Sequence, residues 1–176
     1  MSGADNQQER LDSYISGFVD GEGCFAVAVN RNPTCRTGFQ LVPEFHVSQN
    51  GDRSQVLELI HQRFGGAGYI KSNGRKDRAL VYVVRKRGDL LAHVIPFFER
   101  SPLLSTKQQD FEKFAAIVKA MAEGRHRTSG GFSWLLEEAL SMNGGGRFRS
   151  VRWNDVIGSD SESSETIRRT RRVMPS

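Results

Sequence analysis

The chain has 176 residues, of which 38% are hydrophobic and 26% charged, and its formal net charge is +5 at pH 7. This length suits one hydrophobic core rather than two ordinary domains, and the composition excludes collagen-like and wholly disordered proteins. The longest apolar stretches are much shorter than the ~20 residues that a bilayer-spanning helix needs, and the polar N-terminus does not resemble a signal peptide, so we expect no membrane insertion and no secretion.

The first predicted element is a short, almost wholly apolar helix over residues 10–20, preceded by a disordered N-terminus at residues 1–9. Alternating apolar and polar residues then predict two strands, near residues 25–30 and 41–48, each with one face in water. Pro43 lies inside the second strand. Because proline cannot donate a hydrogen bond to a neighbouring strand, we expect a sheet edge or a bulge there.

The second half of the pattern predicts a helix at residues 54–64, strands at 69–72 and 79–84, a helix that begins near Asp89 with Pro96 at its end or at a kink, a helix from Ser105 and a further helix at 128–142. The predicted organisation is therefore a main domain at residues 10–124, a C-terminal helical extension at 125–153 and a flexible basic tail at 154–176.

The first helix has features that need an explanation beyond burial. Gly17 and Gly21 lie four residues apart beside Ser16, so a second backbone can approach that face closely. A glycine inside a short helix costs roughly 0.5–1 kcal/mol relative to alanine, and tight packing against another helix would compensate. Glu22 follows the helix end, where the helix dipole disfavours a carboxylate, so a divalent cation would resolve the conflict. The alternative is an ordinary buried helix ended by an Asp-Gly turn.

Residues 15–23, Ile-Ser-Gly-Phe-Val-Asp-Gly-Glu-Gly, resemble the signature of the LAGLIDADG endonucleases, and the helix-then-strand context agrees. Ser16 replaces the usual alanine and Glu22 an aspartate. The resemblance implies an α+β fold of αββαββα order, with a curved antiparallel sheet forming a saddle on the helices. It also implies a homing endonuclease that hydrolyses double-stranded DNA with Mg²⁺, for which Mn²⁺ or Ca²⁺ can substitute.

The resemblance also implies roles for single residues. Glu22 would bind the metal with the Gly21 carbonyl, while Asp20 would support the helix end. Gln49 would position the attacking water, and Lys107 would offset charge on the scissile phosphate. The alternatives are a solvent-exposed strand end for Gln49 and a surface lysine for Lys107, although a cation near the start of a helix opposes the helix dipole.

The signature occurs once in the chain, and family members with one copy form homodimers that cut a pseudo-palindromic site. The two motif helices would then meet at the two-fold axis. The predicted interface consists of Tyr14, Ser16, Gly17, Phe18, Asp20 and Gly21.

The positive charge is concentrated in residues 24–87, which hold eleven Lys or Arg and four Asp or Glu, a net of +7. The polar strand faces of this region can contact base edges and phosphates in a major groove, and Glu44 could accept from a cytosine amine. The alternative is a simply solvated face. The predicted DNA-binding residues are Ala28, Asn30, Asn32, Arg36, Gln40, Glu44, His46, Ser48, Lys71, Asn73, Arg75, Lys76 and Arg78, with Arg147 and Arg149 after the last helix. The arginine-rich end would either grip flanking phosphate or solubilise the chain.

Two other functions fit the same fold: a maturase that binds intron RNA, and a DNA-binding regulator that does not cut. Intact Glu22, Gln49 and Lys107 argue against a regulator. Cys24 and Cys35 form no disulfide or metal-binding pattern, so we expect an intracellular, reducing compartment, either the cytoplasm with its nucleoid or an organelle matrix. An intron-encoded mobile genetic element is the expected origin.

Overall fold

The structure, a computed structural model, describes residues 3–74 and 78–145. Its helices and strands are α1 (Gly3–Glu22), β1 (Gly23–Arg31), β2 (Phe39–Asn50), α2 (Gln55–Arg63), β3 (Tyr69–Ser72), β4 (Ala79–Val84), α3 (Arg87–Asp89), α4 (Ile95–Arg100), α5 (Lys107–Ala122) and α6 (Ser129–Gly145). This order confirms the predicted αββαββα arrangement with an extra helix behind it. None of the described helices is both long and apolar enough to span a bilayer.

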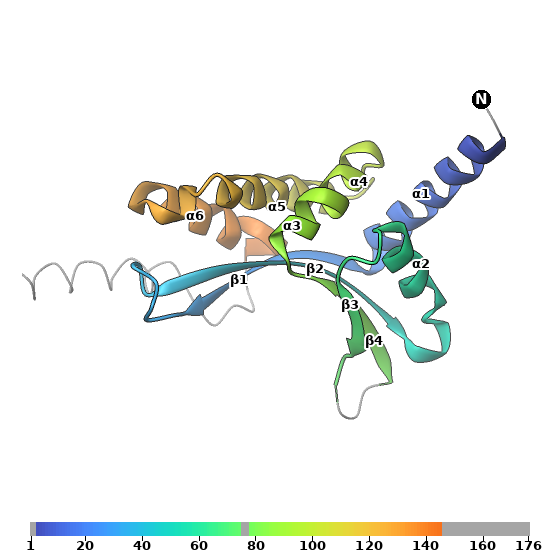
Figure 1. Cartoon of the computed structure of the whole chain (residues 1–176), viewed down its shortest axis with the longest axis horizontal. Coiled ribbons are helices and arrows are strands. Elements are labelled where there is room, and N and C mark those ends of the chain that lie inside the picture. Colours follow the sequence, from blue (N-terminus) through green and yellow to red (C-terminus); the bar gives the residue numbers. More distant parts are fainter. Residues whose placement is uncertain (1–2, 75–77, 146–176) are drawn as a thin grey trace, which may run out of the picture.

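The four strands form one antiparallel sheet in the order β1-β2-β4-β3. The β1–β2 register runs without interruption from the pair Gly23–Val47 to the pair Arg31–Phe39, so these strands form one long hairpin. Figure 1 shows that the sheet curves and that α4, α5 and α6 lie on one side of β1 and β2. One face of the hairpin thus packs against helices, and the other is free to meet a partner.

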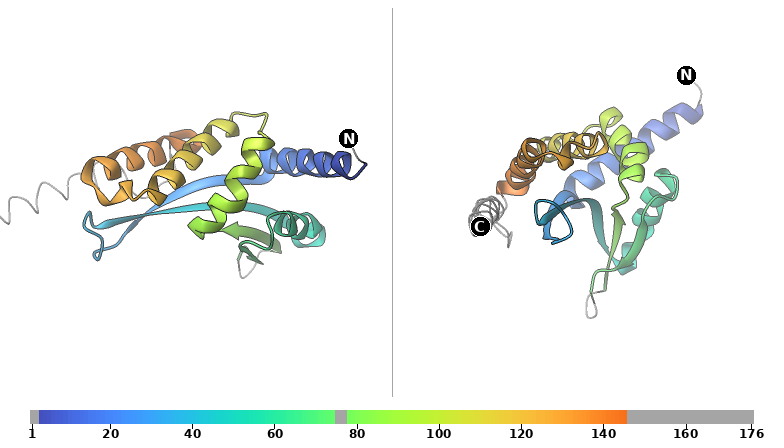
Figure 2. Two further views of the ribbon diagram at one scale, coloured as in Figure 1. Left: turned by 45° about the horizontal axis from the view of Figure 1, so that its top comes forward. Right: turned by 60° about the vertical axis from the view of Figure 1, so that its left-hand side comes forward.

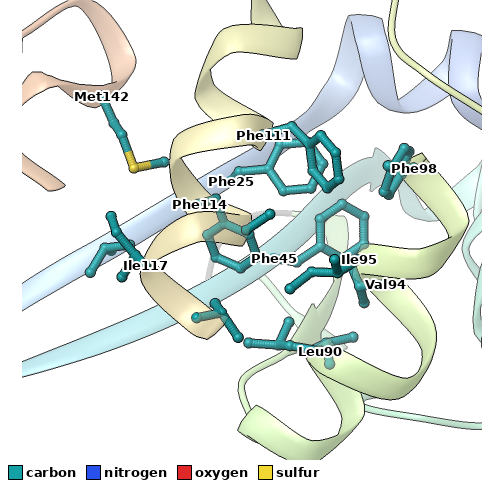
Figure 3. Close-up of a cluster of buried hydrophobic side chains, with 14 of the residues drawn as sticks. Phe25, Phe45, Leu90, Val94, Ile95, Phe98, Phe111, Phe114, Ile117 and Met142 are labelled. Atoms are coloured by element: carbon teal, nitrogen blue, oxygen red, sulfur yellow. The ribbon is translucent and has the colours of Figure 1, made fainter. Parts of the chain in front are cut away.

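Phe25 lies inside the aromatic part of the hydrophobic core. Its ring centroid lies 5.2 Å from the centroids of Phe45, Phe98 and Phe111, which belong to β2, α4 and α5 (Figure 3). All four side chains are buried, and each contributes ~1.5–3 kcal/mol relative to an exposed phenylalanine. Because Phe25 follows Glu22 by three residues, this cluster fixes the position of the junction between α1 and β1.

The structure explains how Pro43 and Pro96 are accommodated within a strand and a helix. Pro43 lies in β2 opposite Val27, but β2 pairs with β4 only from Phe45 onward, so the other side of β2 is open at the proline. The predicted edge position is confirmed. Pro96 follows a π-helical turn, Leu90–Val94, within a continuous helical segment, so it does not end the helix. The wider turn accommodates the proline, which lacks an N–H.

The helix α1 begins at Gly3 rather than near residue 10, so the prediction of disorder is wrong for residues 3–9. Polar contacts support its exposed first turns: Gln8 Nε2 donates to Asp12 Oδ1 (2.9 Å), and the Ser13 hydroxyl donates to the Glu9 carbonyl (2.8 Å). Figure 2 shows this part of α1 projecting beyond the rest of the fold. Apolar periodicity cannot detect such a helix, because no side of it is buried.

Candidate metal centre and DNA-facing surface

Glu22 and Gly21 end α1, and both are exposed. Among the described residues, the Glu22 carboxylate makes no ion pair and no side-chain hydrogen bond. The next residue, Gly23, is buried and starts β1, where an added Cβ would lie 2.5 Å from a Val19 methyl group. The tight junction therefore holds a free carboxylate and a backbone carbonyl side by side at the end of the helix.

Lys107 crosses from the start of α5 to the end of α1. Its ammonium group donates to the carbonyls of Val19 (3.0 Å), Gly21 (3.4 Å) and Gly23 (2.6 Å). A cation is favoured there, because the last carbonyls of a helix form the negative end of its dipole. The interpretation as an ordinary surface lysine is thus wrong. The ammonium group lies away from the start of α5, where the helix dipole disfavours it, and binds the end of α1, where the dipole favours it.

Asp20 connects the motif helix to the loop before α5. Its carboxylate accepts hydrogen bonds from the backbone N–H groups of Leu104 (3.2 Å) and Ser105 (3.0 Å) and from the Ser105 hydroxyl. The Ser105 hydroxyl oxygen in turn accepts from the Lys107 backbone N–H (3.1 Å). Asp20 therefore fixes the position from which Lys107 reaches across, in agreement with its predicted supporting role.

Gln49 lies near the same end of the molecule. The pair Gly23–Val47 is the last between β1 and β2, so Gln49 continues β2 alongside the end of α1. Its side chain is half-buried, and its Oε1 accepts from the Asn50 backbone N–H (2.7 Å). The strand register thus places Gln49 toward the end of α1 that holds Glu22, while its amide is turned toward its own backbone, and its catalytic role stays a prediction.

The oxygen donors at the end of α1 are suited to a hard divalent cation, since Mg²⁺ and Ca²⁺ bind carboxylate and carbonyl oxygens. One protomer supplies too few of them. Within residues 3–74 and 78–145, no group of three His, Cys, Asp or Glu side chains could hold a metal ion. The donor set fits the predicted metal in kind, and further ligands must come from outside this protomer.

The exposed side of α1 carries a stripe formed by Tyr14, Gly17, Phe18 and Gly21, at helical spacings of three and four. Tyr14 is 52% exposed and stacks on Phe18, with ring centroids 6.3 Å apart. A Cβ atom added at Gly17 or Gly21 would meet nothing within 4 Å. These glycines therefore pack against nothing within the described protomer.

Ser16 does not belong to this exposed stripe. It is only 6% exposed, and its hydroxyl lies 3.0 Å from the carbonyl oxygens of both Ser101 and Pro102. The prediction that Ser16 contributes to a dimer surface is wrong, because this side chain attaches α1 to its own protomer. Asp20 likewise uses its carboxylate within the protomer.

The face of the sheet away from α5 and α6 carries most of the predicted DNA-binding residues. Neighbouring side chains on it form polar contacts, such as Asn32 Nδ2 donating to Gln40 Oε1 (3.0 Å). On this face or at its edges lie Ala28, Asn30, Asn32, Gln40, Glu44, His46, Ser48, Lys71, Asn73 and Arg78. Arg75, Lys76, Arg147 and Arg149 lie outside the described residues.

Arg36 is an exception among the predicted DNA contacts. Its Nη2 donates to the hydroxyl of Ser129 (3.0 Å), the first residue of α6. It also lines a cavity with Arg87, His126 and Phe132, residues that belong to the helical side of the hairpin. The prediction that Arg36 faces DNA with the sheet residues is therefore not supported: the turn of the hairpin bends this side chain toward the helices.

A row of four side chains crosses β1, β2 and the end of β4 on the open face, and sequence reasoning missed its last member, Arg85. Cys24 is paired with His46 across the strands, and His46 Nδ1 lies 3.1 Å from Glu44 Oε1. Arg85 Nε forms a short contact with the other Glu44 oxygen. Contact with His46, followed by Arg85, lowers the pKa of Glu44 to about 2, and hydrogen bonding to Cys24, followed by Glu44, raises the pKa of His46 to about 9.

The chain thus has an α+β fold, in which a curved antiparallel sheet leaves one polar face open and a glycine-containing helix ends in an exposed acid. The chain belongs to the LAGLIDADG endonuclease family, whose model matches residues 15–118. It is 34% identical over 134 residues to a probable intron-encoded endonuclease of Neurospora crassa, a match that covers 76% of this chain. The chain spans only 29% of the length of that relative.

Solved structures agree with this assignment. The homing endonuclease I-TnaI is 38% identical, with a TM-score of 0.72, and the match covers 86% of this chain and 96% of I-TnaI. The LAGLIDADG homing endonuclease I-LtrWI, bound to its target DNA, is 33% identical with a TM-score of 0.75; here the match covers 83% of this chain and 47% of I-LtrWI. The predicted family and fold class are thus confirmed.

Proposed function

We propose that the protein is a site-specific endonuclease that cuts double-stranded DNA as a homodimer, with divalent metal held between the ends of two α1 helices. One observation carries the proposal: Gly21 and Glu22 are exposed at the end of a helix whose outer face has room for a second helix. The experiment is a cleavage screen with Mg²⁺ on a library of randomised duplex sites. Specific double-strand breaks at a recurring near-palindromic site are expected.

The dimer is supported by apolar surface that one protomer leaves uncovered. Leu104 is 95% exposed although Asp20 holds its backbone in place. It lines a cavity of about 700 Å³ beside α1, together with Ser13, Gly17 and Pro102. Exposed apolar side chains such as Tyr14 and Leu104, next to a helix face that carries glycine at positions 17 and 21, are typical of a subunit interface. A two-fold axis along α1 would bury Tyr14 and Leu104 and bring the two Glu22 side chains together.

Replacing Gly17 with leucine should separate the dimer without unfolding the protomer. The added side chain meets nothing in its own chain, and leucine has a better helix propensity than glycine by up to ~1 kcal/mol, so thermal stability of the monomer should be preserved. The same bulk would keep two helices apart. Light scattering after size exclusion should show monomers, and cleavage should be lost with dimerisation.

A matched control is Gly130→Leu in α6, where an added Cβ also meets nothing within 4 Å. This variant should remain dimeric and active. A Gly17→Leu protein that is still dimeric and cuts at the normal rate would contradict the proposed interface.

The metal would supply a Lewis acid and lower the pKa of a bound water, which is the chemistry that phosphodiester hydrolysis requires. LAGLIDADG endonucleases are metal-dependent enzymes. We propose Mg²⁺ for this chain, with Mn²⁺ or Ca²⁺ as substitutes. Glu22 and the Gly21 carbonyl would hold the ion, Lys107 would offset phosphate charge, and Gln49 would orient the attacking water.

Binding of DNA to the open sheet face should weaken steeply as salt rises. A protein that makes 6–10 phosphate contacts loses roughly 10³–10⁵-fold in affinity between 50 and 200 mM salt, because bound counterions are released. Fluorescence anisotropy with a labelled duplex in Ca²⁺ measures this slope. Arg78→Ala should reduce the slope by ~1 while preserving site preference. An affinity that hardly changes with salt would contradict the proposed surface.

An intracellular compartment and an origin in an intron are proposed from the intron-encoded relatives alone. Intron RNA remains an alternative partner that no contact in the described residues favours over DNA. A binder without nuclease activity would shift the mobility of the target duplex in EDTA and in Mg²⁺ alike, and would never nick it.

A further inference from the structure

The row formed by Cys24, His46, Glu44 and Arg85 leaves only one end free to contact DNA. His46 Nδ1 lies 3.1 Å from one Glu44 oxygen, without the geometry of a hydrogen bond, and Arg85 Nε contacts the other oxygen. The pairs Phe45–Val84 and His46–Val83 set the register, which places Glu44 directly opposite Arg85 on the open face. Both oxygens of the carboxylate therefore already have a basic neighbour before any DNA arrives.

This arrangement changes what Glu44 can recognise. A carboxylate that accepts from a cytosine amine must present a free oxygen to the groove. The Glu44 side chain is only 21% exposed, whereas the Arg85 side chain is 50% exposed. The predicted contact between Glu44 and cytosine is thus disfavoured, since the carboxylate is mostly covered by its neighbours while the Arg85 side chain reaches further into solvent.

Arg85 has N–H donors that the contact with Glu44 does not use. A guanidinium group carries five N–H donors in a fixed fork, and Glu44 is contacted through Nε. The Nη1 and Nη2 atoms make no hydrogen bond or ion pair to any other described residue, so their outer edge can donate two parallel hydrogen bonds. This geometry matches the O6 and N7 acceptors that guanine presents in the major groove.

We propose that Arg85 binds a guanine in each half of the DNA target, and that Glu44 and His46 are positioning residues that hold the arginine fork toward the base. This inference rests on the proposed function, because it assumes that the open sheet face lies in a major groove. Guanine is favoured over a phosphate as the ligand because Arg85 lies on the sheet face itself, next to Glu44 and His46, where side chains would meet base edges in the groove.

The charges of Glu44 and His46 agree with a role in holding Arg85 in one position. At neutral pH the lowered pKa of Glu44 and the raised pKa of His46 keep the carboxylate ionised and the imidazole protonated. An imidazolium on one side and a guanidinium on the other fix the carboxylate between them. Ordering Arg85 in the free protein reduces the rotamer entropy that would otherwise be lost on binding.

The row also lies close to the proposed cleavage centre. Cys24 is the second residue of β1 and follows Glu22 by two positions, and His46 is opposite Cys24. The guanine should therefore belong to the part of each half-site nearer the centre, while residues at the far end of the hairpin, such as Asn30 and Gln40, face the outer positions.

The test is selection of binding sites from a randomised duplex library in Ca²⁺, followed by sequencing. The wild-type protein should select guanine at one symmetric inner position. Arg85→Ala should reduce the preference for guanine over the other bases there by roughly 5- to 150-fold, the range for one bidentate contact. Arg78→Ala, the matched arginine control, should weaken binding to all sites alike.

The Glu44→Gln variant distinguishes a residue that positions Arg85 from one that only stabilises the fold. It keeps the size of the side chain but loses the charge that holds Arg85, so base preference at that one position should relax while all other positions stay selective. A merely structural role would lower affinity evenly across positions. If Arg85→Ala selects the same bases as the wild type, the proposal is wrong even though specific cleavage continues. Failure of the wild type to select or cut any duplex would instead overturn the proposed function.

Discussion

Glu22→Gln should abolish DNA cleavage while leaving DNA binding nearly unchanged. The carboxylate is exposed and makes no ion pair or side-chain hydrogen bond among the described residues, so its removal breaks no contact that holds the fold. It is also the single carboxylate that the end of α1 offers to a cation. Loss of such a group should lower the rate by at least ~100-fold, because charge stabilisation at a reacting phosphate is among the largest catalytic effects. Single-turnover cleavage of the selected duplex in Mg²⁺ measures this rate.

The stability of the same variant distinguishes a catalytic residue from a structural one. A negative charge next to the carbonyl end of a helix is unfavourable, so the metal-free Glu22→Gln protein should melt no lower than the wild type. Glu58→Gln, an exposed glutamate on α2, is the matched control and should leave cleavage and melting unchanged. Normal cleavage by Glu22→Gln would remove this residue from the metal centre. A large fall in melting temperature would show instead that the carboxylate has a structural partner.

The strands and the core could be predicted from the sequence because each has one buried face. Phe25 and Val27 alternate with small alanines, Phe45 and Val47 alternate with polar residues, and the structure buries all four. The same reasoning failed for residues 3–9, a helical segment in which the side chains that the structure describes, those of residues 5–9, are all exposed. Periodicity reports burial, so it detects an element only where the fold covers it.

Contacts between distant segments could not be predicted. Ser16 looks like part of a small-residue face, yet its partners Ser101 and Pro102 are about 85 residues away in sequence. Arg36 is basic and lies in a turn between two strands, but its guanidinium group donates a hydrogen bond to Ser129, the first residue of α6. In both cases the direction of the side chain is set by a residue that is close in space but far along the sequence, and the local spacing of residues cannot reveal such a neighbour.

The Arg85 contact was missed for a related reason. Only the strand register places this residue opposite Glu44, and a shift of one residue would turn it to the other face. The signal in the sequence is weak: a basic residue with the right alternation, just after a strand of apolar residues. The strand register therefore distinguishes Arg85 from the neighbouring Lys86 and Arg87, although all three residues are basic.

Lys107→Met should lower both stability and cleavage, and the two losses should be separable. Without the ammonium group, the carbonyls of Val19, Gly21 and Gly23 lose a shared, partly buried donor. Leaving such groups without a partner costs ~1–3 kcal/mol, which should reduce the melting temperature by several degrees. The cleavage rate should fall by at least ~100-fold at a temperature where the variant is still folded, if the cation also faces the scissile phosphate.

A control must remove a comparable amount of stability from α1 without touching the metal centre. Arg63→Met does so, because Arg63 Nε and Nη2 each donate to a carboxylate oxygen of Asp12 at 2.7 Å, far along the helix from Glu22. This variant should melt lower than the wild type yet cut at the normal rate when folded. If Lys107→Met behaves in the same way, Lys107 only caps the end of α1. A rate loss specific to Lys107→Met, with DNA affinity kept, would show that one ammonium group both fixes the helix that presents Glu22 and acts on the phosphate beside it.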